Sequence, residues 1–189
     1  AVGSSSFSSG TLVNSTNAPI TVVYTVTPNY DNTPVYCSGA SFTVTIIVNP
    51  VPNVTDPTDQ VVCVGTSTAV AFTSPLNVSG TVYTWSNDNL NTGLVGSGTG
   101  DIATFATTNT TNAAIISTVT VTPSYVNAGV TCTGSSQTFT ITVNPTPNVS
   151  DPTDQVVCVG TSTAAVTFVS PLNVSGTVYT WSNDNLNTG

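Results

Sequence analysis

The feature that most constrains the fold of this chain is a long internal repeat. Residues 52–69 return as residues 147–164 with one change, at an offset of 95 residues. Residues 74–93 then return unchanged as residues 170–189, where one inserted residue has raised the offset to 96. A repeat of this length corresponds to a whole folding unit, so the sequence predicts an array of similar domains.

The repeat also predicts where the domains begin and end. Looser matches at the same offset pair Asn49-Pro50 with Asn144-Pro145, and two prolines within four residues stiffen the chain at both points. The residues with which the chain begins would continue the pattern after Gly189, so we expect a window from a longer periodic polypeptide. The expected division is the C-terminal part of one repeat at 1–50, a complete repeat at 51–145 and the N-terminal part of the next at 146–189.

Alternation of apolar and polar residues predicts β-strands throughout the repeat. In residues 115–122, Val119 and Val121 share one face, and in residues 138–143 three apolar residues alternate with three threonines, which is typical of a strand with one wet face. Residues 123–136 between these strands are predicted to be a loop. About seven short strands in each repeat, with no helical period, predict an all-β chain of tandem antiparallel β-sandwiches of immunoglobulin-like type.

Two aromatic pairs are predicted to anchor the cores of these sandwiches. Alternation in residues 81–85 places Tyr83 and Trp85 on the same face of a strand. Their counterparts in the next repeat are Tyr179 and Trp181. Large aromatic side chains in a regular strand pattern favour a core role over an exposed one.

The charged residues exclude several classes of partner and reaction. The chain has eight aspartates and no glutamate, lysine, arginine or histidine, which gives a net charge of −8. Without a basic patch, nucleic acid is excluded as a direct partner, and so is electrostatic docking on anionic lipid. No apolar run approaches the roughly 18 residues of a membrane-spanning helix, so no direct membrane insertion is expected. The usual bases for a nucleophile are missing, so we predict that the chain is not an enzyme.

The four cysteines favour an oxidising compartment and leave several pairings open. The favoured one joins Cys63 to Cys132 within the complete repeat, leaves Cys37 and Cys158 to pair outside this window, and would stabilise the fold by about 4 kcal/mol. A second arrangement joins Cys37 to Cys63 and Cys132 to Cys158 across the junctions. A third joins the first cysteine of each repeat to the second cysteine of the next, and a fourth leaves buried thiols free. Sequence spacing alone does not choose between them.

Calcium is the one cofactor for which ligands are available, because carboxylate oxygens are the groups that it prefers. The competing interpretation is that the Asp-Pro and Asn-Asp pairs are turn residues whose side-chain oxygens bond to the nearby backbone. We favour the turn interpretation, and therefore predict no metal and no cofactor. The candidate calcium ligands are Asp56, Asp59, Asp88, Asp151 and Asp154.

The order of short motifs carries a resemblance to a known family. The motifs are residues 60–65, 82–85, 98–103, 119–123, 132–134 and 140–145. Together they resemble the PKD-like and immunoglobulin-like tandem repeats of giant surface proteins in Bacteroidota, which include gliding-motility adhesins exported by type IX secretion. PKD domains proper follow the strand tryptophan with Phe-Gly-Asp-Gly, whereas Trp85 is followed by Ser-Asn-Asp-Asn. The resemblance therefore implies the sandwich fold and the role as a repeat.

These observations predict a structural role outside the cell. The leading hypothesis is a repeated module of a secreted or cell-surface stalk or filament that projects a binding tip, with cell adhesion and gliding motility implied by the resemblance. The expected partners are neighbouring repeats of the same polypeptide and parallel copies in a fibre. One alternative is that the repeats bind carbohydrate or surfaces through Tyr30 and Tyr125. Another is a pilus-like subunit assembled by strand donation, against which an unbroken chain through the Asn-Pro-x-Pro junction would argue.

Overall fold

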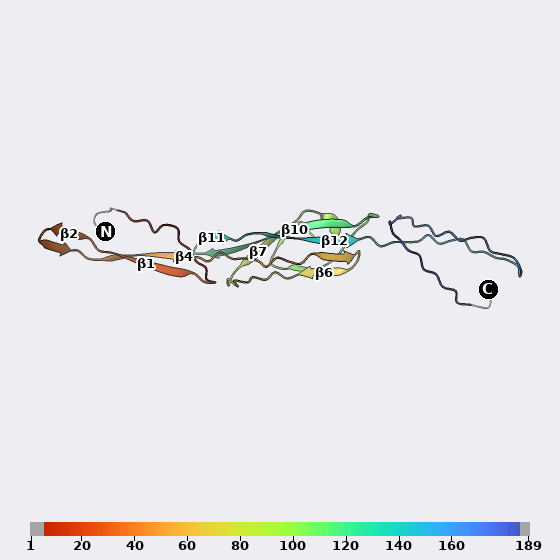
Figure 1. The fold of residues 1–189 in the computed structure, drawn as a ribbon, viewed down its shortest axis with the longest axis horizontal. Helices are drawn as coiled ribbons and strands as arrows, with labels where there is room; N and C mark the ends of the chain where they lie inside the picture. The colour runs from red at the N-terminus through yellow and green to blue at the C-terminus, as the bar shows by residue number, and fades with distance from the viewer. Residues whose placement is uncertain (1–5, 186–189) are drawn as a thin grey trace.

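The computed structural model describes residues 6–185, which form β-strands, loops and one short 3-10 helix, η1 (Leu90–Thr92). The molecule is elongated, and residues 20–48, 60–144 and 146–185 follow one another along its long axis (Figure 1). The chain runs without a break through both Asn-Pro-x-Pro segments. No helix among residues 6–185 is long and apolar enough to cross a membrane.

The middle repeat, residues 51–145, forms a sandwich of two sheets. The larger sheet has the order β5-β12-β10-β7-β8 with β11 also paired to β10, and the smaller sheet pairs β6 with β9. All of these pairings are antiparallel except that of β5 with β12. The strands are β5 (Gln60–Cys63), β6 (Ser67–Val70), β7 (Val82–Asn87), β8 (Ser97–Thr99), β9 (Ile102–Ala106), β10 (Ile115–Asn127), β11 (Val130–Thr133) and β12 (Gln137–Asn144).

Alternation along β10 and β12 builds the core of this sandwich. Val119, Val121, Ile141 and Val143 are fully buried, while the threonines between them lie at or near the surface. Burial of each such side chain contributes on the order of 1.5–3 kcal/mol. The predicted all-β chain with an immunoglobulin-like sandwich is confirmed, and the threonine-covered faces of these strands lie where the sequence pattern places them.

Aromatic side chains join the two sheets at one side of the core. Trp85 is 7% exposed, and Gly98 on β8 lies so close to it that a Cβ at this position would overlap the indole ring. Tyr83 is half-buried, with its ring centroid 5.6 Å from that of Phe72. Phe72 in turn meets Phe139 edge-on at 6.4 Å. The aromatic pair predicted from residues 81–85 therefore lies with one ring inside the core and one at its margin.

The structure corrects the loop that was predicted for residues 123–136. β10 continues to Asn127, and a tight turn leads into β11. Proline usually ends a strand because it lacks an N–H donor. Here Pro123 falls between two ladders, since pairing with β12 ends at Val121 and pairing with β11 begins at Ser124, so the missing N–H is not needed.

The parts of the chain on either side of the sandwich are incomplete versions of it. The N-terminal part contains β1 (Ile20–Val26), β2 (Asn29–Asn32), β3 (Val35–Ser38) and β4 (Phe42–Val48), in which β1 pairs with β4 and β2 with β3. These pairs repeat those of β10 with β12 and β11. Residues 146–185 contain no assigned strand, yet they keep the turns of residues 51–89. The bond from Ser150 N to Val169 O, for example, matches that from Thr55 N to Thr73 O.

Amide and hydroxyl side chains hold the loops in a chain that has no cationic side chain. The Asn109 amide donates to the carbonyl oxygen of Val143 at 2.8 Å, and the Asn87 amide donates to that of Leu94 at 2.9 Å. Thr107 Oγ1 donates to the carbonyl of Cys63 at 2.9 Å. Each bond contributes only about 1 kcal/mol, but leaving a buried carbonyl without a donor would cost more.

The first prediction concerns the core. Phe139→Ala should lower the free energy of unfolding by about 3–5 kcal/mol, because it leaves a cavity where β12 faces Phe72. Val130→Ala, at an exposed position on β11, is the control and should change it by less than about 0.5 kcal/mol. Denaturant unfolding of the whole chain measures both variants. Equal losses at the two positions would contradict the assignment of the core.

Candidate functional site

The most distinctive site in the structure is the first junction, residues 49–52, where the chain passes from the N-terminal part into the middle repeat. Pro50 and Pro52 are both fully buried. The connections between domains usually lie exposed at the surface, and few contacts are made across them. Burial of two prolines at such a point shows that other residues cover the junction.

The cover is the end of the β10–β11 hairpin, residues 123–134, which we call the junction hairpin. It extends beyond Gln137, where β12 begins, in the direction of the N-terminal part of the chain (Figure 1). Near its tip, Asn127 Nδ2 donates to Asn49 Oδ1 at 2.7 Å. This bond links residues 78 positions apart in the sequence and joins the middle repeat to the last residues of the preceding one.

A glycine lets the base of the hairpin meet the junction. Gly134 N donates to Pro123 O at 2.9 Å, which closes the hairpin next to β12. A Cβ at Gly134 would overlap the carbonyl oxygen of Pro52, so no larger residue fits there without movement of the backbone. Sequence reasoning missed this role, although a signal was present, because Gly39 recurs as Gly134 at the repeat offset.

The second junction, residues 144–147, shows what the hairpin does. Its proline residues are counterparts of Pro50 and Pro52, but Pro145 is only half-buried and Pro147 is exposed. No junction hairpin follows it among the described residues. The two junctions have nearly the same sequence, so the difference in burial comes from the residues packed around the first junction, among them those of the hairpin, and not from the prolines themselves.

The aspartates that were considered as calcium ligands are spread over the chain. No group of three acidic, cysteine or histidine side chains is close enough for a metal among residues 6–185. Asp59 Oδ1 accepts from Thr140 N and Asp88 Oδ1 accepts from Thr118 N, each at 2.6 Å. Each of these two aspartates thus lies just outside the end of one strand, and its carboxylate accepts the N–H of a residue in the neighbouring strand. The remaining candidates, Asp56, Asp151 and Asp154, are exposed.

The four cysteines are free, and the favoured bridge between Cys63 and Cys132 is not formed. Cys63 pairs with Asn144 at one end of the sheet, whereas Cys132 pairs with Tyr125 beyond the other end. Along β10, the positions level with Cys63 and with Cys132 are about 33 Å apart. A disulfide needs Cα atoms within roughly 7 Å, so the bridge within one repeat would require a different fold.

The predicted aromatic residues occupy three different environments. Tyr30 is 67% exposed near the end of the molecule, while its counterpart Tyr125 is half-buried in the junction hairpin. Trp181 is exposed, unlike Trp85, and Tyr179 is half-buried. Burial raises the pKa of the Tyr83 hydroxyl, with Asp101 adding to the shift and Ser74 opposing it.

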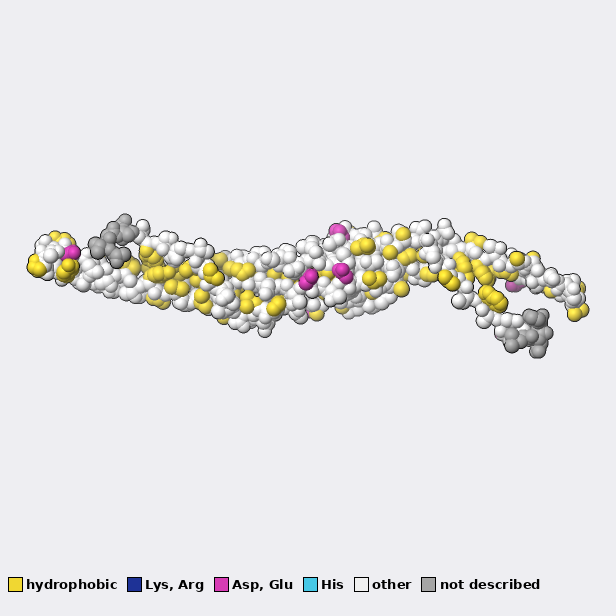
Figure 2. All heavy atoms as spheres, viewed as in Figure 1, with side chains coloured by type: hydrophobic (Ala, Val, Ile, Leu, Met, Phe, Trp, Pro, Cys, Tyr) yellow, Lys and Arg dark blue, Asp and Glu magenta, His cyan; other side chains and the backbone are white. Residues whose placement is uncertain are grey.

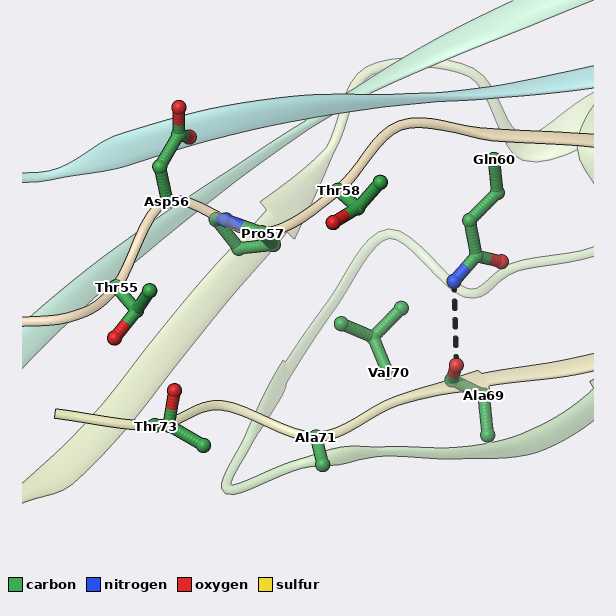
Figure 3. A pocket seen from close by; sticks show the side chains of 9 residues that line it. All are labelled: Thr55, Asp56, Pro57, Thr58, Gln60, Ala69, Val70, Ala71 and Thr73. Atoms are coloured by element: carbon green, nitrogen blue, oxygen red, sulfur yellow. Dashed lines mark hydrogen bonds between the residues drawn. The ribbon is translucent and has the colours of Figure 1, made fainter.

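The middle repeat also has a shallow, open depression of about 320 Å³ between residues 55–60 and 69–73 (Figure 3). The Val70 side chain and the Gln60 amide face this space, and the amide donates to Ala69 O at 3.3 Å. Asp56, the one ionisable group in its lining, points away from it. The depression therefore offers hydroxyl, amide and methyl groups to the solvent without a pair of groups for acid–base chemistry.

The middle of the chain thus forms one complete β-sandwich whose hairpin contacts the preceding junction. The sequence matches the PKD-like domain family over residues 2–52 and 60–147. Since these segments make up more than half of the chain, it belongs to the PKD-like domain family, whose members are typically structural modules outside the cell. No curated protein and no solved structure matches the chain.

The second prediction tests the contact between the hairpin and the junction. Gly134→Ala should destabilise the chain by about 1–3 kcal/mol, because the added methyl group forces Pro52 and the hairpin apart. Denaturant unfolding measures the loss, and chemical-shift changes should extend to residues 49–54.

Gly39→Ala is the matched control. A Cβ at Gly39 meets the Pro28 ring as one at Gly134 meets the Pro123 ring, but no junction backbone lies beside Gly39. It should cost less than about 1 kcal/mol. Equal effects of the two variants would show that the contact with Pro52 does not matter.

Proposed function

We propose that this chain is a structural segment of an extended extracellular stalk or filament, in which serial β-sandwiches hold a binding region away from a cell surface. The observation that supports this function best is the buried first junction. A repeat whose hairpin covers the preceding junction limits bending at that point. When bending is limited, each added repeat increases the end-to-end length of the molecule. Cell adhesion, with surface gliding as a special case, is the biological role that such a stalk would serve.

The surface of the described residues fits a passive structural part. Figure 2 shows mainly uncharged side chains with a few aspartates and no basic groups. Threonine and asparagine supply the polar surface, and the resulting negative charge lets copies repel one another weakly in solution. Neighbouring repeats are the partners for which the structure offers a contact, through Asn127 and Asn49.

The alternative of a sugar-binding module has less support. In a sugar-binding module, Tyr30 and Tyr125 would be the rings on which sugars stack. Tyr125, however, lies in the hairpin that covers the junction, with its ring against Gly80. The alternative of a pilus-like subunit is not needed for the middle repeat, because all strands of that sandwich come from residues 60–144 of one chain. The stalk therefore remains the function that we propose.

The third prediction is the shape in solution. A compact chain of this length would have a radius of gyration of about 16 Å. Small-angle X-ray scattering, extrapolated to zero concentration, should give roughly twice that value or more, with the constant cross-section of a rod. A radius near that of a compact chain would contradict the stalk, and so would a profile without a defined cross-section, which indicates independent flexible beads.

A further inference from the structure

The depression beside β6 in the middle repeat is closed at both of its ends by hydrogen bonds (Figure 3). At one end, Thr55 N donates to Thr73 O at 2.7 Å. At the other end, the Gln60 amide donates to Ala69 O at 3.3 Å. Residues 55–60 and 69–73 therefore run in opposite directions, and the depression of about 320 Å³ lies between these two bonds.

A proline explains why the two segments do not pair along their whole length. In an antiparallel ladder, pairs of residues that exchange main-chain bonds recur at every second position. Counting from the contact of Thr55 with Thr73, the next such pair would be Pro57 with Ala71. Proline has no N–H group, so it has no bond to give to Ala71 O. The ladder is interrupted at this point, and the depression occupies the interruption.

The main-chain groups of Ala71 face the depression and have no partner in the protein. Phe72 N donates to Asp101 Oδ1 at 2.9 Å, on the side of the segment that faces β9. Main-chain groups of successive residues in an extended segment point to opposite sides, so the N–H and C=O of Ala71 point toward residues 55–60. No main-chain bond to Ala71 is formed among residues 6–185. Ala71 is exposed and lines the depression, so both groups are open to a ligand.

This open pair of main-chain groups matches a secondary amide. The carbonyl of such an amide can accept from Ala71 N while its N–H donates to Ala71 O, as the main chain of an added strand would. The Val70 side chain faces the same space and offers an apolar contact next to these groups. The remaining lining includes the hydroxyl groups of Thr55, Thr58 and Thr73. The set of groups therefore suits a neutral ligand that carries both an amide and hydroxyl groups.

We propose that the depression binds the acetamido group of an N-acetylated sugar. The acetamido carbonyl bonds to Ala71 N, the acetamido N–H bonds to Ala71 O, and the methyl group packs against Val70. The sugar hydroxyls meet the threonine hydroxyls of the lining. A peptide strand has the same amide, but the bonds made by Thr55 and Gln60 bar it from running through the depression. The site needs no aromatic ring for stacking, and its role goes beyond that of the stalk.

The next repeat does not copy this wall of the depression. The corresponding bonds lead from Gln155 to Ala164 and from Ser150 to Val169, so one additional residue lies between them. This residue is the insertion that separates the two exactly repeated segments of the sequence. Insertions between repeats lie in loops, often on a binding face. We therefore assign the site to the middle repeat alone.

The fourth prediction is weak, selective binding of N-acetylglucosamine. In an NMR titration of the full chain, this sugar should shift the amide signals of Thr58, Val70 and Ala71, with a dissociation constant in the millimolar range because the contact is small. Glucose lacks the acetamido group and should leave these signals in place. Equal shifts with glucose would overturn the proposal, and so would the absence of shifts with N-acetylglucosamine.

A variant at Ala71 tests the main-chain bond. Ala71→Pro removes an N–H that no other residue uses, and proline is tolerated at a sheet edge. It should weaken binding of N-acetylglucosamine by roughly tenfold. Ala71→Val is the matched control, because it keeps the N–H and its side chain points away from the depression in Figure 3. Circular dichroism checks that both variants fold, and unchanged binding by a folded Ala71→Pro chain would refute the proposed contact.

A small peptide amide distinguishes the two sources of this ligand chemistry. N-acetylalanine methylamide has secondary amides but no sugar ring, so it should bind more weakly than N-acetylglucosamine. Binding as tight or tighter would assign the depression to peptides and overturn the sugar proposal. Each of these results leaves the proposed stalk untouched, because the stalk is tested by the shape of the chain in solution and not by its ligands.

Discussion

The rest of the structure depends on one long strand, β10, which serves two purposes. Over most of their length β10 and β12 place Val119, Val121, Ile141 and Val143 in the core of the sandwich. Beyond Pro123 the same β10 continues with β11 as partner and covers the buried prolines of the first junction. Core and junction are therefore coupled, because movement of the hairpin at the junction would disturb the strands that hold the sheets together.

The composition explains why this coupling is made from packing and neutral hydrogen bonds. A chain without lysine, arginine or histidine has no ion pairs to fix its loops, its strand ends or its contacts between repeats. Asparagine amides take over at the loops, aspartate carboxylates accept strand N–H groups, and an amide pair joins Asn127 to Asn49. The bonds between uncharged groups, such as that of Asn127 with Asn49, are insensitive to salt, in contrast to surface salt bridges. Such independence suits the extracellular stalk that we propose.

Sequence reasoning predicted the fold well where the local alternation of residue types decides which face of a strand is buried. The alternation in residues 115–122 and 138–143 gave the buried and exposed sides of two strands. It missed features that depend on two distant segments. The extension of β10 past Pro123 needs two ladders that meet at that residue, and the cysteine pairing was predicted without knowing that Cys63 and Cys132 lie at opposite ends of the sheet. Gly134 faces Pro52 across a distance in sequence that no local pattern reports.

The central claim is that the junction hairpin makes the two sides of the first junction move as one body. Residual dipolar couplings measured by NMR for backbone amides test this most directly, because they report the orientation of each segment against a common frame. Couplings from residues 20–48 and from residues 60–144 should fit a single alignment tensor with the same magnitude of order. Two tensors of clearly different magnitude would show that the segments reorient independently, and would contradict the account of a stiff, covered junction.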